Sequence, residues 1–185
     1  ANSGHQVVIG GPSVLTYTGL IIHSDSTSGN GQVSFADGRG ASDSWRSSVN
    51  YNHGNDSIAF ATNAAARMTI DSSGNVGIGV TPSTGWVSST DFTALQIGSG
   101  LALWGRGSGD HERLGLTANL YHDGSAWKHL NTGRVTAYEQ NDGKHIFNYH
   151  ASQAAGTSVT PTTAMVIDAS GNVGIGTGSP FTTGG

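Results

Sequence analysis

Apolar and polar residues alternate along two nearly identical stretches of this sequence, and each stretch predicts a β-hairpin. RMTIDSSGNVGIGVTP spans residues 67–82, and AMVIDASGNVGIGTGSP spans residues 164–180. In each copy an alternating strand runs into an Asp-x-x-Gly turn, with Asp first and Gly fourth. The strand that follows places Val and Ile on one face and two glycines on the other. From Ile70 to Gly79 the copies agree at 9 of 10 positions, so the chain is modular.

Two glycines on one face of a strand need a physical reason, because glycine is entropically costly there. The usual reason is the close approach of another backbone, and a solvent-exposed bulge or bend is the alternative. We expect this motif to support association between chains. Its residues are Asp71, Gly74, Val76, Gly77, Ile78 and Gly79 in the first copy, and Asp168, Gly171, Val173, Gly174, Ile175 and Gly176 in the second.

The rest of the chain predicts further short strands separated by clusters of Gly, Asn, Asp and Ser, as in an all-β protein. Only 63–67 could form one helical turn. We predict two consecutive β-rich modules at 1–82 and 92–185, joined by a linker at 83–91, each ending in the Gly-rich hairpin. The additional predicted strands are 6–9, 14–22, 32–35, 44–51, 57–61, 94–97, 101–104, 114–121, 134–139 and 145–150.

Composition favours a fold that is completed by chain association. Ile, Leu, Val and Phe make up only 36 of the 185 residues, a thin supply for a buried core. Charge is sparse, with 8 Lys and Arg against 12 Asp and Glu, which argues against a nucleic-acid partner. No apolar run is long enough for membrane insertion. The chain starts at Ala1 and ends at Gly185, and we expect it to be part of a longer protein.

The two repeated phrases resemble the modules found in the distal shafts of bacteriophage tail fibres, upstream of an intramolecular chaperone domain. The phrases Leu95–Gly98 and Tyr121–Lys128 also resemble the body of such a module, so the resemblance covers most of the chain. It implies an elongated, intertwined, β-rich homotrimer that serves in host attachment as a virion component outside the cell. The implied partners are two further copies of the chain, other tail proteins, and a host-surface glycan or other receptor.

The chemistry-bearing residues point to binding more than to catalysis. The 8 histidines contain no His-x-His pair and the chain has no cysteine, so we expect neither a metal site nor a cofactor. No nucleophile elbow or dinucleotide loop occurs in a suitable context, and we expect no enzymatic activity. The richest polar-aromatic segment is 121–127, and Tyr121, His122 and Trp127 are the candidate ligand-binding residues, although aromatic side chains more often pack in cores.

Two other functions remain open at the level of sequence. One is a polysaccharide-degrading, tailspike-like enzyme, because a carboxylate pair can form in space without any sequence signature. The other is a bacterial surface adhesin built from similar modules. A depolymerase with a β-solenoid fold should show many short, even rungs, whereas this chain has two long modules that end alike.

Overall fold

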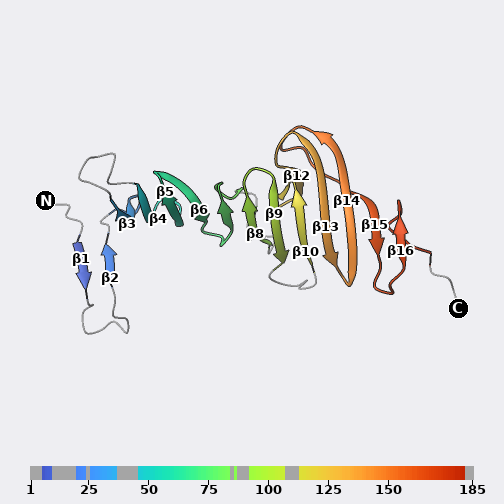
Figure 1. Cartoon of the computed structure of the whole chain (residues 1–185), viewed down its shortest axis with the longest axis horizontal. Helices are drawn as coiled ribbons and strands as arrows, with labels where there is room; N and C mark the ends of the chain where they lie inside the picture. The colour runs from blue at the N-terminus through green and yellow to red at the C-terminus, as the bar shows by residue number, and fades with distance from the viewer. Residues whose placement is uncertain are drawn as a thin grey trace. The chain divides into compact units, whose positions relative to one another are not determined.

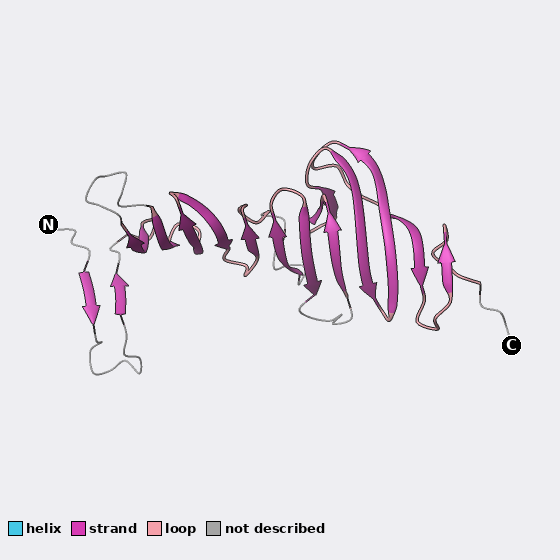
Figure 2. Cartoon of the chain, viewed as in Figure 1, coloured by secondary structure: helices cyan, strands magenta, loops and turns pink. Residues whose placement is uncertain are grey.

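The computed structural model contains strands, turns and loops, and no helix occurs among the residues it describes. These are 6–9 and 20–23, for which only the backbone is described, and 26–36, 46–83, 86, 92–106 and 113–181. The all-β prediction is therefore confirmed for this part of the chain (Figure 2). The chain divides into two compact units, Ala1–Ser72 and Ser73–Gly185. This division falls within the first repeated turn, whereas the predicted modules divide at 82 and 92.

Six strands occur among the described residues of unit 1. Its antiparallel sheet has the order β6-β5-β4-β3, and β1 pairs with β2 separately. The strands are β1 (Gln6–Ile9), β2 (Leu20–His23), β3 (Asn30–Phe35), β4 (Ser47–Asn52), β5 (Ser57–Thr62) and β6 (Ala65–Ile70). Part of the strand predicted at 14–22, and the start of the one predicted at 44–51, lie outside the described residues.

Unit 2 is built on a larger sheet with the order β7-β8-β9-β10-β13-β14-β15-β16 (Figure 1). Every neighbouring pair is antiparallel except β7 and β8, which are parallel. A separate hairpin, β11-β12, completes the unit. The strands are β7 (Val76–Ile78), β8 (Phe92–Ile97), β9 (Leu101–Arg106), β10 (Leu114–Ala118), β11 (Leu120–His122), β12 (Trp127–His129), β13 (Gly133–Asn141), β14 (Lys144–Gln153), β15 (Thr162–Ile167) and β16 (Val173–Ile175).

The core of unit 2 lies against one face of this sheet. Alternate residues of the central strands are buried, and aromatic rings fill the space above them. Trp104 is 2% exposed and lies 5.2 Å from the Phe92 ring, measured between ring centroids. Trp127 reaches the same cluster from the β11-β12 hairpin. Trp86, within the predicted linker, is only 1% exposed, so that segment contributes a core residue.

The second repeated phrase forms the hairpin that its sequence predicts. Val166 pairs with Gly174 in the β15–β16 ladder. Asp168 opens the turn: its carboxylate accepts hydrogen bonds from the backbone N–H groups of Ser170 and Asn172, both 2.9 Å long. Gly171 has a φ of +86°, which L-residues with side chains seldom adopt. The Asp and Gly positions of the phrase therefore have the turn roles assigned to them.

The glycine face of the hairpin strand is covered by the same chain. A Cβ on Gly77 would overlap the Val80 carbonyl and the Pro82 ring, which fold back over the strand. A Cβ on Gly174 would lie 3.0 Å from the Thr177 carbonyl oxygen and 3.1 Å from Pro180 Cγ. The close approach of a backbone is thus present at Gly77 and Gly174, and the chain supplies it within five or six residues. It is not present at the second glycine of each pair, because a Cβ on Gly79 or Gly176 would meet nothing within 4 Å.

Two local expectations are wrong. The helical turn proposed at 63–67 is instead a two-residue β-turn, because Asn63 and Ala64 both have positive φ, at 50° and 57°, as type I′ hairpins require. The strand predicted at 114–121 breaks at Asn119, whose φ is 61°. The Asn119 side chain bonds to the Asn131 and Arg134 carbonyls, at 2.9 and 3.1 Å, which stabilises the break.

Gly115 gives the sharpest test of this packing. The indole of Trp104 occupies the space that a Cβ on Gly115 would need, whereas Gly105, on the neighbouring strand, faces open space. We expect Gly115→Ala to destabilise the protein by about 1–3 kcal/mol through overpacking, and Gly105→Ala to leave stability nearly unchanged. Denaturant unfolding followed by tryptophan fluorescence measures both. Equal stabilities for the two variants would contradict this packing.

Candidate self-association surface

The opposite face of the unit 2 sheet carries an unbroken row of apolar side chains. The row follows cross-strand partners through all eight strands, one residue per strand. Its members, from β7 to β16, are Val76, Leu95, Leu103, Leu116, Tyr138, Phe147, Met165 and Ile175. We call this set the apolar row. Cross-strand neighbours of this kind lie about 5 Å apart, so the row is one continuous strip.

Four of the eight side chains of the apolar row are exposed in the single chain, and the other four are partly buried. Leu103 is 48% exposed, Leu116 is 47% and Phe147 is 41%. Ile175, at the end of the row, is 81% exposed. No member of the row is charged. A continuous apolar strip on the surface of a soluble protein is unusual, and it typically marks an interaction site.

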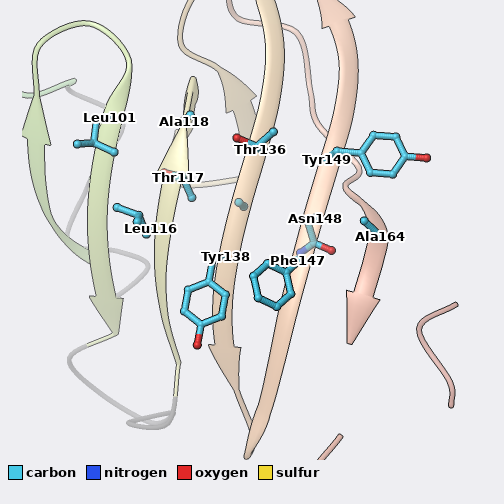
Figure 3. Close-up of a pocket in the computed structure, with 11 residues that line it drawn as sticks. Leu101, Leu116, Thr117, Ala118, Thr136, Tyr138, Phe147, Asn148, Tyr149 and Ala164 are labelled. Carbon is cyan, nitrogen blue, oxygen red and sulfur yellow. The ribbon is translucent and has the colours of Figure 1, made fainter. Parts of the chain in front are cut away.

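The central part of the row borders a shallow groove of about 470 Å³. Figure 3 shows the rings of Tyr138 and Phe147 side by side on adjacent strands, with Leu116 on the next strand. The two ring centroids are 5.0 Å apart. The groove is lined by Leu101, Leu116, Thr117, Ala118, Thr136, Ala137, Tyr138, Phe147, Asn148, Tyr149 and Ala164.

Unit 1 repeats the pattern on a smaller scale. Val33, Val49, Phe60 and Met68 are successive cross-strand partners from β3 to β6. The first three are 41%, 39% and 40% exposed. Each unit therefore has its own apolar row, formed independently by its own strands.

The branched residues of the repeated hairpins belong to these exposed surfaces. Val76 and Ile175 are members of the apolar row, and Ile78 and Val173 are 38% and 54% exposed. Gly77 and Gly174 are buried and lie on the opposite face, as strand alternation requires. Gly79 and Gly176 take positive φ values of 68° and 69°, where the strand ends.

The polar-aromatic loop combines core and surface residues. The Trp127 ring lies among Trp86, Phe92 and Trp104, at centroid distances of 6.1, 5.4 and 4.8 Å. The ring of His122 lies 5.1 Å from that of Trp127. Tyr121 also packs against this cluster, so all three candidate ligand-binding residues contact the core. A pattern of aromatic and polar residues cannot distinguish this role from sugar stacking.

Tyr121 also lines a polar groove of about 610 Å³. We call the side of unit 2 that carries this groove and the β11-β12 hairpin the loop side. The groove is lined by Ser83, Tyr121, Asp123, His129, Leu130, Ala155 and Gly156. Asp123 accepts hydrogen bonds from Ser125 Oγ and from two backbone N–H groups, and these bonds hold its pKa well below the usual range. Lys128 Nζ lies 3.5 Å from the Asp123 carboxylate. The groove offers hydroxyl, carboxylate and aromatic groups together.

Two of the histidines in the described part of the chain form a close pair. His129 Nε2 and His150 Nδ1 are 3.1 Å apart, and His129 is fully buried. Within the described residues, no group of three or more His, Cys, Asp and Glu side chains could hold a metal ion. The same residues contain no helix that could cross a membrane.

Sequence reasoning missed several features of these surfaces. The apolar row depends on the register between strands, and single-strand alternation does not specify it. Glu139, buried and bonded to Arg113 at 3.2 Å, also gave no sequence signal. A scan of protein families finds no match for this chain, and a search of curated proteins finds no significant one.

Two histidines should make unit 2 less stable in acid. Burial lowers the pKa of His122 and, with the neighbouring His150 charge, that of His129. A depressed folded pKa means that the unfolded chain binds the proton more readily. The stability that the two neutral histidines contribute is complete above about pH 6.5. It is lost as the pH falls through their lower folded-state pKa values. We expect a lower melting temperature at pH 5 than at pH 7.5.

The variant that tests this is His129→Gln. Melting temperatures measured between pH 5 and pH 8 should depend less on pH in His129→Gln than in the wild type. A wild-type melting temperature that stays constant across this range would contradict the prediction.

Proposed function

We propose that this chain is a structural and adhesive, non-catalytic segment of a bacteriophage tail fibre, and that it works as a homotrimer. The observation that carries the proposal is the apolar row, which crosses the described strands of the unit 2 sheet and has half of its side chains exposed in the single chain. Exposed apolar area of this extent would favour aggregation unless a partner covers it. The resemblance of the repeated hairpins to tail-fibre modules supports the same assembly.

Two further copies of the chain are the partner that fits this surface. The row carries no charge, so like faces can meet without burying unpaired ions. Its two aromatic members, Tyr138 and Phe147, are neighbours in the middle of the sheet and have aliphatic residues on both sides, which suits packing against a second apolar sheet about 10 Å away. In a trimer each sheet would turn its row toward the common axis, while the loop side of each unit stays outside.

The loop side is where we place contact with the host. The polar groove beside Tyr121 combines two hydroxyl groups, a carboxylate and an aromatic ring, which are groups that can hydrogen-bond to and stack on a surface glycan. Three equivalent grooves would raise a weak affinity through avidity, by roughly 10² to 10⁴ when the geometry permits simultaneous engagement. Such a segment belongs to the virion, outside the cell, joined to other tail proteins. A glycan array probed with the wild type and with Tyr121→Ala would identify the sugar.

The experiment that tests assembly places a charge in the row. Leu116→Lys puts an ammonium group where the proposed trimer is driest, at a cost of roughly several kcal/mol per chain. We expect sedimentation equilibrium to give a trimer for the wild type and a monomer for this variant at micromolar concentration. Ala154→Lys, at an exposed position away from the row, is the control and should remain trimeric.

Circular dichroism of Leu116→Lys separates loss of assembly from loss of folding. A wild-type mass of one chain, or a Leu116→Lys variant that is folded and still trimeric, would refute the proposal.

A further inference from the structure

The two copies of the repeated hairpin end in strands that have the same sequence but different numbers of neighbouring strands. β7 and β16 both read Val-Gly-Ile. β7 has a parallel neighbour in β8, where Val76 pairs with Leu95 and Ile78 with Ile97. β16 pairs with β15 on one side and is the last strand in the sheet order of the described residues (Figure 1). The first copy therefore shows which kind of strand can pair with a Val-Gly-Ile edge such as that of β16.

The free edge of β16 presents backbone groups in the same way as β7. Gly176 donates its N–H to the Ala164 carbonyl on β15, at 2.8 Å. In an antiparallel ladder alternate residues point to opposite neighbours, so the N–H and C=O of Ile175 point to the free edge. The counterpart of Ile175 is Ile78, whose carbonyl accepts a bond of 2.9 Å from the N–H of Gly98, just beyond β8.

In the first copy, an asparagine next to β7 hydrogen-bonds to the chain that leads into β8. Asn75 is 1% exposed and makes two hydrogen bonds to the chain that follows β7. Its Nδ2 donates to the Trp86 carbonyl at 2.6 Å, and its Oδ1 accepts from the Ala94 N–H at 2.9 Å. Both contacts fix the path by which β8 enters alongside β7.

The equivalent residue of the second copy is Asn172. Its Nδ2 donates to the Asp168 carboxylate within the turn, at 3.0 and 3.3 Å from the two oxygens, and the residue is half-buried. The neighbouring apolar side chains are more open than in the first copy, since Ile175 is 81% exposed and Ile78 is 38% exposed. The edge of β16 thus has three features: the backbone N–H and C=O of Ile175 directed away from β15, an exposed apolar side chain, and Asn172 at the position that Asn75 has in the first copy.

We propose that the edge of β16 is a docking site for a parallel strand of the β8 kind, the opening strand of a further module of this repeat. The occupant is an extended segment with the pattern of Phe92–Ile97, and Asn172 holds its main chain as Asn75 holds β8. Main-chain pairing along an exposed edge is an established way to bind an extended segment. This site is the backbone edge of β16; it shares Ile175 with the apolar row, but a docked strand would use the main chain of that residue.

The test uses the 185-residue chain and a synthetic peptide with the sequence of residues 84–99. Hydrogen exchange followed by NMR measures the backbone N–H of Ile175 with and without the peptide. We expect the peptide to slow exchange at Ile175, and to leave Gly176 unchanged because its N–H is already bonded to Ala164. A peptide of the same composition in scrambled order should have no effect.

Asn172→Ala supplies the matched variant. Loss of two hydrogen bonds should weaken peptide binding at least about tenfold. Ser170→Ala, in the same turn, is the control and should bind like the wild type. The oligomeric state, measured from the mass of the particle with and without the peptide, separates this proposal from assembly through the apolar row. The edge of β16 should bind the peptide whether the chain is monomeric or trimeric.

Three results would overturn the proposal. The first is equal exchange at Ile175 with and without the peptide, and the second is equal protection by the scrambled peptide. The third is concentration-dependent protection of Ile175 in the chain alone, which would assign the edge to a second copy of this chain.

Discussion

The structure of unit 2 depends on an asymmetry between the two faces of one sheet. On one face, Trp104 and the β11-β12 hairpin build a core from the chain's own residues. On the other, the apolar row crosses eight strands, and Leu103, Leu116, Phe147 and Ile175 in it are 41–81% exposed. Because hydrophobic burial is the main favourable contribution to folding, an uncovered row of this length leaves much of that contribution unused. Association between chains would supply it.

The repeated hairpin shows how a short phrase can build a strand end without a large core. Asp168 accepts hydrogen bonds from the Asn172 side chain and from backbone N–H groups of the turn, and these bonds depress the pKa of its carboxyl. Because Gly174 has no side chain, the chain can fold back so that Thr177 and Pro180 lie against the strand at that residue. Valine and isoleucine are left on the outer face, where they extend the row. One phrase therefore sets the turn, covers its own glycine face and continues the apolar surface.

Local chemistry could be predicted from the sequence wherever neighbouring residues decide the outcome. The second hairpin follows from Asp168, Gly171 and the alternation of Val173 and Ile175, all of which act within ten residues. Alternation also predicts most strands of both units. The break at Asn119 was missed because it depends on carbonyls of residues 131 and 134, which the fold brings close. Trp127 was misleading for a similar reason, since its ring packs among residues distant in sequence.

The central claim is that the apolar row is covered by other copies of the chain, and the distance between equivalent points on that face tests it most directly. The chain has no cysteine, so Ala118→Cys gives a single site for a spin label on the exposed face, between Leu101 and Thr136 in the ladder. Sheets packed face to face lie about 10 Å apart, so electron paramagnetic resonance should give one short distance on the order of 10–20 Å. The absence of dipolar coupling between labels in the assembled protein would contradict it.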